Sequence, residues 1–131
     1  MSGFAIVNLQ DLDNAIGDRV PGLEGRLARK HLDSRDLGVS RFTYAANLRS
    51  PKAHSHREQE EAYVVVGGGG RVLLDGEVRD LRRWDVLRVA PEVLRAFEAG
   101  PDGLDLIVIG GPKPEEGDGV LGDANWPDEG A

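Results

Sequence analysis

Cysteine is absent from this chain of 131 residues, and histidine occurs only three times. Without cysteine the protein can form neither a disulfide nor a thiolate metal site. An excess of basic charge is also lacking, because the formal net charge is −7 at pH 7. Nucleic-acid binders need a basic face for phosphate, and anionic lipid attracts basic segments. We therefore expect neither a nucleic acid nor a membrane as partner.

Long apolar runs are missing as well. The N-terminus, MSGFAIVNLQ, has no basic region, and its apolar stretch, FAIV, has four residues. That is too short for the apolar part of a secretory signal or for a membrane span, so the sequence predicts a cytoplasmic protein. The length fits one ordinary domain. The apolar fraction of 40% is enough for a core.

What the sequence does contain is a series of short apolar runs separated by turn signals. The runs are SRFTYAANL, AYVVVG, RVLLDGEV, DVLRV and LDLIVIG, and they are rich in residues that favour strands. Asp75-Gly76 predicts a tight hairpin turn, because both residues tolerate positive φ. Helix is expected only in LQDLDNAI (9–16) and in part of LEGRLARKHL (23–32). The pattern predicts an all-β sandwich or barrel with a short N-terminal helical or irregular segment.

Two segments rich in glycine interrupt this pattern. The run Gly67 to Gly70 lacks the Lys-Ser/Thr and the helix of a phosphate loop, so it predicts a tight, irregular connection between two strands. The last segment, GPKPEEGDGVLGDANWPDEGA, is rich in glycine, proline and acidic residues. It predicts a loop or tail that Trp126 pins to the rest of the protein. Trp84, before DVLRV, is expected to pack against the core.

The stretch HSHREQEEAYVVVGGGG (54–70) is the most informative one for function. Residues two apart on a strand point to the same face, so His54 and His56 would present both imidazoles together. Glu61 starts the next apolar run and can reach the same place, whereas its neighbour Glu60 would face the other way. Two imidazoles and one carboxylate leave open positions on a divalent metal. The alternative is that these are solvated polar residues at a strand edge.

The segment HSHREQEEAYVVVGGGGRVLLDGE resembles the first motif of the cupin superfamily: His-x-His, a gap, Glu, six residues, Gly. In this comparison Glu61 matches the family's carboxylate and Gly68 its glycine. LRRWDVLRVAPEVLRAFEAG resembles the second motif more loosely, with Trp84-Asp85 in place of Gly-Asp and Pro91 at the proline position. The resemblance covers about residues 39 to 109. It implies a double-stranded β-helix, or jelly-roll, barrel.

Arg95 stands where the resemblance implies a fourth metal ligand, a histidine. Arginine keeps its proton and cannot ligate a metal, but it pairs bidentately with a carboxylate. That carboxylate is either Glu61 or an acid group on a ligand. Alternation places Val93, Arg95 and Phe97 on one face. Arg95 lies inside if that face lines the barrel, and otherwise it points outwards beside Phe97.

The resemblance implies an N-terminal segment (1–38) that packs on the barrel, a cupin core (39–112) and an acidic Gly/Pro-rich tail (113–131). The expected function is binding of a small polar or acidic molecule in the barrel, with Arg95, Gln59, Tyr63 and Phe97 as the ligand-binding residues. Gln59 is alternatively a loop residue, and Tyr63 is alternatively a packing residue.

A divalent ion (Zn, Ni, Mn or Fe) is expected to be held weakly or not at all by His54, His56 and Glu61, and no organic cofactor is expected. The alternative function is a metal-dependent enzyme of isomerase, lyase or oxygenase type that uses the same three residues. A purely structural role stays open. The resemblance also implies a homodimer.

Overall fold

The structure is a computed structural model that describes residues 3–128. Its regular elements are one short 3-10 helix, η1 (Leu9–Asp11), and eight strands. The strands are β1 (Leu23–Leu27), β2 (Gly38–Tyr44), β3 (Lys52–His56), β4 (Glu61–Leu74), β5 (Glu77–Arg82), β6 (Val86–Val89), β7 (Arg95–Gly110) and β8 (Gly119–Asp123). The chain is therefore all-β, as the sequence predicts. Among the described residues, none forms a helix with the length and apolarity that a membrane span requires.

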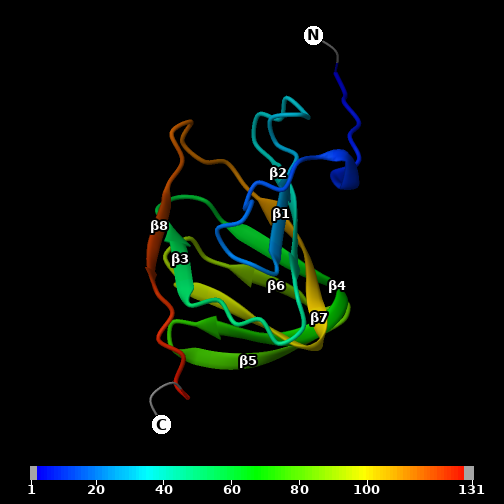
Figure 1. The fold of residues 1–131 in the computed structure, drawn as a ribbon. Coiled ribbons are helices and arrows are strands. Elements are labelled where there is room, and N and C mark those ends of the chain that lie inside the picture. The colour runs from blue at the N-terminus through cyan, green and yellow to red at the C-terminus, as the bar shows by residue number, and fades with distance from the viewer. Residues whose placement is uncertain (1–2, 129–131) are drawn as a thin grey trace.

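The strands form one antiparallel sheet that curls into a barrel (Figure 1). Its order is β1-β2-β7-β3-β8, and β4 pairs with β5, β6 and β7. The second half of β7 lies between β2 and β4. At the start of β7, Arg95 pairs with His54 of β3 and with Leu74 of β4. This curled sheet is the jelly roll that the resemblance implies, and it brings β3, β4 and the start of β7 to the same part of the barrel.

The glycine run lies inside one strand of 14 residues, β4, and does not connect two strands as predicted. The pairing of β4 with β7 shifts register between Val65 and Gly67 and again between Gly68 and Gly70. Gly68 has a φ of 63°, which side chains disfavour. A Cβ at Gly70 would lie 2.0 Å from the Glu98 carbonyl oxygen. The glycines therefore allow β4 to bulge and approach β7 without ending.

The N-terminal region contains less helix than the sequence predicts. Only Leu9–Asp11 within 9–16 is helical, and the Asn8 side chain caps it by accepting from the Gln10 N–H. The helix expected within 23–32 is wrong, because Leu23–Leu27 forms strand β1 along β2. Gly25 favours this outcome. It weakens a helix, and a Cβ there would lie 2.7 Å from the Phe42 ring, so the close pairing of β1 with β2 needs glycine.

The core follows the alternation along β7, where Leu104, Leu106 and Val108 are buried and the residues between them are more exposed. These three pack with buried side chains from β2, β4, β6 and the first half of β7: Tyr44, Tyr63, Val65, Val72, Val89, Phe97 and Ala99. The inner layer of the barrel is thus apolar over most of its length, which makes every polar group inside it informative.

The C-terminal segment is more ordered than the predicted loop or tail. Residues 119–123 form β8, which pairs along β3. Trp126 is 2% exposed and packs against Ala53, Leu73 and Ala96, while its indole N–H donates to the Ser50 carbonyl oxygen at 2.8 Å. The pinning role expected of Trp126 therefore matches the structure. The division of the chain at residues 38 and 112 stays a prediction.

Trp84 has an unusual backbone conformation for a large residue. Its φ is 76°, in the region that glycine favours, and it occupies the position where the resemblance expects a glycine. The side chain is 65% exposed, so the packing role expected from the sequence is wrong. The turn requires the backbone angle, and this angle directs the indole outwards.

Candidate functional site

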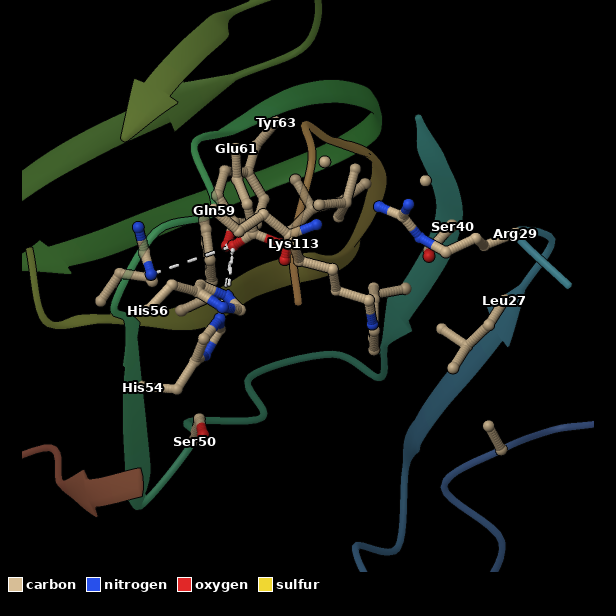
Figure 2. Close-up of a pocket in the computed structure, with 18 of the residues that line it drawn as sticks. Leu27, Arg29, Ser40, Ser50, His54, His56, Gln59, Glu61, Tyr63 and Lys113 are labelled. Carbon is tan, nitrogen blue, oxygen red and sulfur yellow. Dashed lines mark hydrogen bonds and ion pairs between the residues drawn. The ribbon is translucent and has the colours of Figure 1, made fainter. Parts of the chain in front are cut away.

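A cavity of about 570 Å³ lies inside the barrel (Figure 2). Its volume falls within the range of small-molecule sites. Apolar and aromatic side chains form much of its wall, including Phe42, Tyr44, Phe97, Leu106 and Val108. A polar cluster from β3, β4 and β7 occupies one side of it. This combination of apolar walls and a few convergent polar groups is typical of a ligand site.

The structure brings His54, His56 and Glu61 together, as the sequence predicts. Strand β3 presents both imidazoles to one side, with ring centres 5.1 Å apart. Glu61 is the first residue of β4, and its Oε1 lies 3.4 Å from His54 Nε2 and 3.3 Å from His56 Nε2. One potential ligand atom from each residue lies within 4.8 Å of the others.

These separations fit a divalent ion. With metal–donor bonds of about 2.1 Å, two donors of one tetrahedral ion lie roughly 3.4 Å apart. Both distances from Glu61 Oε1 match that value. His56 Nε2 is buried and lies 3.3 Å from Glu61 Oε1, so a neutral imidazole can offer its lone pair to a metal beside this carboxylate. The three residues are therefore a chemically reasonable metal site.

Tyr63 completes the surroundings of the Glu61 carboxylate. Its hydroxyl donates a hydrogen bond to Glu61 Oε1 at 2.5 Å. Burial by itself would raise the pKa of Glu61, but hydrogen bonds from His54, His56 and Tyr63 outweigh it and hold the pKa well below its usual range. Burial raises the pKa of Tyr63 well above 10, so the phenol remains a donor. Glu61 is therefore ionised and available as a ligand or a counter-charge.

Asp118 is a part of the site that the sequence analysis missed. Its Oδ1 accepts from His56 Nδ1 at 2.8 Å, and its Oδ2 accepts from the backbone N–H groups of Glu58 and Gln59 at 2.7 and 2.8 Å. Burial would raise the pKa of Asp118, but these three hydrogen bonds lower it to about 2. An ionised carboxylate can only accept, so His56 Nδ1 carries a proton, and Nε2 is the nitrogen that can bind a metal when the imidazole is neutral.

The contact with Glu61 is the largest cause of a raised pKa at His56, and Asp118 raises this pKa further. Burial acts in the opposite direction but does not outweigh them. No local sequence pattern predicts the contribution of Asp118. It lies in the segment GDG, far from His56 in sequence, and only the pairing of β3 with β8 brings the two together.

Arg95 lies inside the barrel and is 0% exposed. Its Nη2 donates to the Ala90 carbonyl oxygen at 2.9 Å, while its Nη1 lies 3.9 Å from Glu61 Oε1, which is too far for a hydrogen bond. The bidentate pair with Glu61 that the sequence allows does not form. Arg95 Nε and Nη1 have no hydrogen-bond partner among the described residues. Two N–H groups of a buried cation are thus left unsatisfied beside the cavity.

The other three predicted ligand-binding residues also line the cavity. The Gln59 side chain is buried and donates from Nε2 to the Gly111 carbonyl oxygen at 3.1 Å, so part of its amide is already engaged. Phe97 packs against the Tyr63 ring at a centroid distance of 4.8 Å. Gln59 and Phe97 therefore shape the wall, and Tyr63 also bonds to the carboxylate of the cluster.

Basic side chains gather around the opening of the cavity. Lys30, His31, Lys52 and Lys113 line it and are exposed, and Arg29 lines it and is partly buried. Acidic side chains among the lining residues are Asp13 and Glu61. Lys52 is paired with Asp123 at 2.7 Å, but the other basic side chains still make this a local reversal of sign in a protein with a net charge of −7. Such a concentration of positive charge attracts anions to the opening.

Comparison with known proteins shows similarity in structure only. No protein-family model and no curated protein matches the sequence. Among solved structures, a cupin protein from Bacteroides fragilis is 23% identical with a TM-score of 0.70, and the match covers 88% of this chain and 89% of that one. The polyketide cyclase RemF from Streptomyces resistomycificus is 17% identical with a TM-score of 0.72, over 95% of this chain and 87% of that one.

A longer protein is also similar. An oxalate decarboxylase from B. subtilis is 16% identical with a TM-score of 0.73, over 87% of this chain and 31% of that one, so this chain spans about a third of its length. At these identities the likeness concerns the fold. It agrees with the resemblance of the His54–Gly68 segment to the first cupin motif. The chain has the fold of the cupin superfamily.

Proposed function

We propose that the cavity binds a small organic acid whose carboxylate pairs with Arg95. The observation that supports this most strongly is the buried guanidinium, with Nε and Nη1 unsatisfied beside the cavity. Leaving such groups without partners costs free energy, so a missing partner is the simplest explanation. A carboxylate is the natural partner, because its two oxygens match the two N–H groups of a guanidinium.

Two further features of the cavity suit an organic acid. The basic residues at the opening favour entry of an anion. The apolar wall formed by Phe42, Phe97 and Leu106 suits a hydrocarbon part rather than a fully polar inorganic anion. The volume of about 570 Å³ leaves room for a molecule of several carbon atoms.

We propose that a divalent ion binds weakly in the absence of the acid and more tightly in its presence. A metal on His54, His56 and Glu61 requires neutral imidazoles. The local charges are then +2 from the metal and +1 from Arg95, against −1 each from Glu61 and Asp118, which leaves +1. Arg95 repels the metal, and one carboxylate would neutralise the excess. When bound, the ion would supply Lewis acidity to the ligand's oxygens.

A metal-dependent enzyme is the second candidate. The Glu61–histidine distances of 3.3 and 3.4 Å favour it, because they match the spacing of donors on one ion. Two similar structures, the polyketide cyclase and the oxalate decarboxylase, are enzymes by name. On this proposal His54, His56 and Glu61 hold the metal for isomerase, lyase or oxygenase chemistry, and Arg95 orients the substrate's acid group.

Calorimetric titration tests the proposed function. Propionate, hexanoate and benzoate are titrated into the parent protein, and their neutral amides serve as ligand controls. We expect at least one acid to bind while its amide does not, and Arg95→Met to weaken that acid at least about tenfold, or 1.4 kcal/mol. Arg35→Met is the matched protein control, since Arg35 is 91% exposed and lies outside the cavity. Equal binding by the parent and Arg95→Met would contradict the proposal.

The same titration with zinc separates the two candidates. If acid and metal bind together, the acid should raise the affinity for zinc in the parent protein and not in Arg95→Met. Zinc that binds stoichiometrically and resists chelators without any acid would favour the enzyme, because Arg95 would then not weaken the metal site.

The homodimer and the cytoplasmic location stay predictions. Several large apolar side chains on the outer surface are exposed, among them Leu121 at 80% and Val86 at 69%. Exposed apolar surface of this kind is commonly covered by a second subunit. We expect light scattering at micromolar concentration to give twice the mass of one chain, and the mass of a single chain would contradict the dimer.

A further inference from the structure

Arg29 lines the opening of the cavity, but its side chain is fixed by a hydrogen bond to the backbone. It follows β1, is partly buried, and donates from Nη2 to the Gly111 carbonyl oxygen at 3.1 Å. No acidic side chain pairs with it among residues 3–128. A single carbonyl therefore orients its guanidinium, and no carboxylate of the described residues neutralises its positive charge.

Two paired glycines create the space that this guanidinium occupies. Gly38 of β2 and Gly110 of β7 are both buried and are direct partners in the sheet. A Cβ on Gly38 would lie 2.7 Å from Arg29 Nη2, and a Cβ on Gly110 would lie 3.7 Å from the same atom and 2.4 Å from Gln59 Nε2. A side chain at position 38 would therefore push the guanidinium out of its slot. Because positions 38 and 110 are glycines, no side chain of the sheet occupies the space beside the Arg29 guanidinium.

Arg29 and Arg95 share this arrangement and differ from Arg41, which lies outside the cavity. Each of the two lines the cavity, donates one hydrogen bond to one backbone carbonyl and has no hydrogen-bonded carboxylate. By contrast, Arg41 forms two hydrogen bonds with Asp105. In Figure 2 Arg29 lies across the cavity from His54 and His56. The cavity therefore has one guanidinium without a hydrogen-bonded carboxylate deep inside and a second one on its opposite side.

We propose that Arg29 binds a second acid group, so that the ligand is a dicarboxylate with its two acid groups at opposite ends. This inference rests on the proposed function, because the first carboxylate is the one at Arg95. Lys113, which is exposed and has no ion-pair partner in the described part of the chain, also lines the cavity and adds positive charge to it. The apolar wall between the two arginines accommodates the hydrocarbon chain that joins the acid groups.

Paired titrations test this inference. Linear dicarboxylates from succinate to suberate are compared with monocarboxylates of the same chain length, each titrated into the parent and its variants. We expect one dicarboxylate to bind at least about tenfold more tightly than its monocarboxylate, a difference of 1.4 kcal/mol. Arg29→Gln should weaken that dicarboxylate at least about tenfold more than it weakens the monocarboxylate.

Two further variants test whether the position of the Arg29 guanidinium matters, or only the presence of a positive charge in this segment. Gly38→Ala keeps Arg29 but displaces its guanidinium, so it should also abolish the preference for the dicarboxylate. Arg35→Gln removes one positive charge from the same connection outside the cavity and should leave the preference unchanged. Melting temperatures within a few degrees of the parent confirm that each variant is folded.

The outcomes distinguish this inference from the proposed function. If monocarboxylates and dicarboxylates of every length bind the parent equally, or if the preference survives in Arg29→Gln, the second acid site is wrong while the first stands. If no acid of either kind binds the parent, the proposed function itself is wrong. A preference lost in both Arg29→Gln and Gly38→Ala, but kept in Arg35→Gln, supports the second site.

Discussion

Arg49 is partly buried and Arg95 is fully buried, but the protein pairs only the first of these two charges by hydrogen bonds to carboxylates. Arg49 donates to Glu98 and to both carboxylate oxygens of Asp128, and its guanidinium lies 4.7 Å from the centre of the Trp126 ring. Arg71 donates to the same Glu98. Arg95 has one carbonyl partner and is more deeply buried than Arg49.

The contrast shows that this fold can satisfy an arginine fully when the arginine has a structural role. The Glu98 cluster, which consists of Arg49, Arg71, Glu98 and Asp128, has its charges paired by side chains of the chain itself. The cavity has a cation with two unsatisfied N–H groups in a far less hydrated place. Pairing stabilises the first region, whereas the second retains a free-energy cost that a ligand's carboxylate would relieve.

The largest expected effect concerns the packing beneath the Glu98 cluster. Trp126 is 2% exposed and anchors the segment that carries β8, so Trp126→Ala should lower the free energy of unfolding by about 3–5 kcal/mol. Trp84 is the matched control, because it is 65% exposed and its removal should change stability by less than about 0.5 kcal/mol. Urea unfolding measures both. Equal losses in the two variants would mean that the C-terminal segment is not held as described.

Removing one charge from each region tests the comparison itself. Glu98→Gln breaks the pairs with Arg49 and Arg71 and should cost about 2 kcal/mol. Arg95→Met removes a buried guanidinium with one hydrogen bond and two nitrogens that lack partners, and it keeps a similar volume, so its loss should be at most about half as large. Urea unfolding in the absence of any acid gives both values. A loss for Arg95→Met that exceeds the loss for Glu98→Gln would mean that Arg95 serves mainly to stabilise the fold.

Substitution of Arg95 by histidine should convert the cavity into a stronger metal site. Arg95→His removes the charge that opposes a dication and supplies the histidine that the resemblance to the second cupin motif implies at this position. We expect zinc or nickel to bind at least about tenfold more tightly than to the parent, a gain of about 1.4 kcal/mol. Calorimetric titration measures it, with Arg35→His as a control because Arg35 is exposed and lies outside the cavity. Equal affinities would show that Arg95 does not stand at the ligand position.

The smallest expected effect is a change in the free energy of unfolding with pH. Burial would raise the pKa of Glu98, but hydrogen bonds from Arg49 and Arg71 lower it below its ordinary value of 4.5. The contribution of Glu98 is therefore fully present above pH 4.5 and is lost as the pH falls through the lower, folded-state value. We expect the stability difference between the parent and Glu98→Gln to shrink between pH 7 and pH 3. A difference that is constant over this range would mean that Glu98 is not paired.

The sequence predicts the fold and the grouping of His54, His56 and Glu61 well because both depend on local patterns. The His-x-His spacing on a strand sets His54 and His56 side by side, and Glu61 at the start of the next strand reaches them. The continuity of β4 through Gly67 to Gly70 could not be predicted in this way. In the sequence the glycines interrupt the run of strand-forming side chains and so predict the end of a strand. In the structure they allow the backbones of β4 and β7 to approach closely.

The remaining parts of the site depend on contacts between distant segments. Asp118 reaches His56 only through the pairing of β8 with β3, and its surroundings in the sequence predict a tail. Arg29 lies in a segment whose composition suggested a helix, and its slot depends on the pairing of Gly38 with Gly110. The sequence alone contains no signal that these residues converge on one cavity.

A crystal structure of the protein with the acid that binds most tightly tests the central claim most directly. Our account predicts the acid's carboxylate within hydrogen-bond distance of Arg95 Nε or Nη1, the two nitrogens that lack partners. It also predicts that the hydrocarbon part lies against the Phe97 side of the cavity. A carboxylate bound elsewhere, with Arg95 Nε and Nη1 still unsatisfied, would contradict the account.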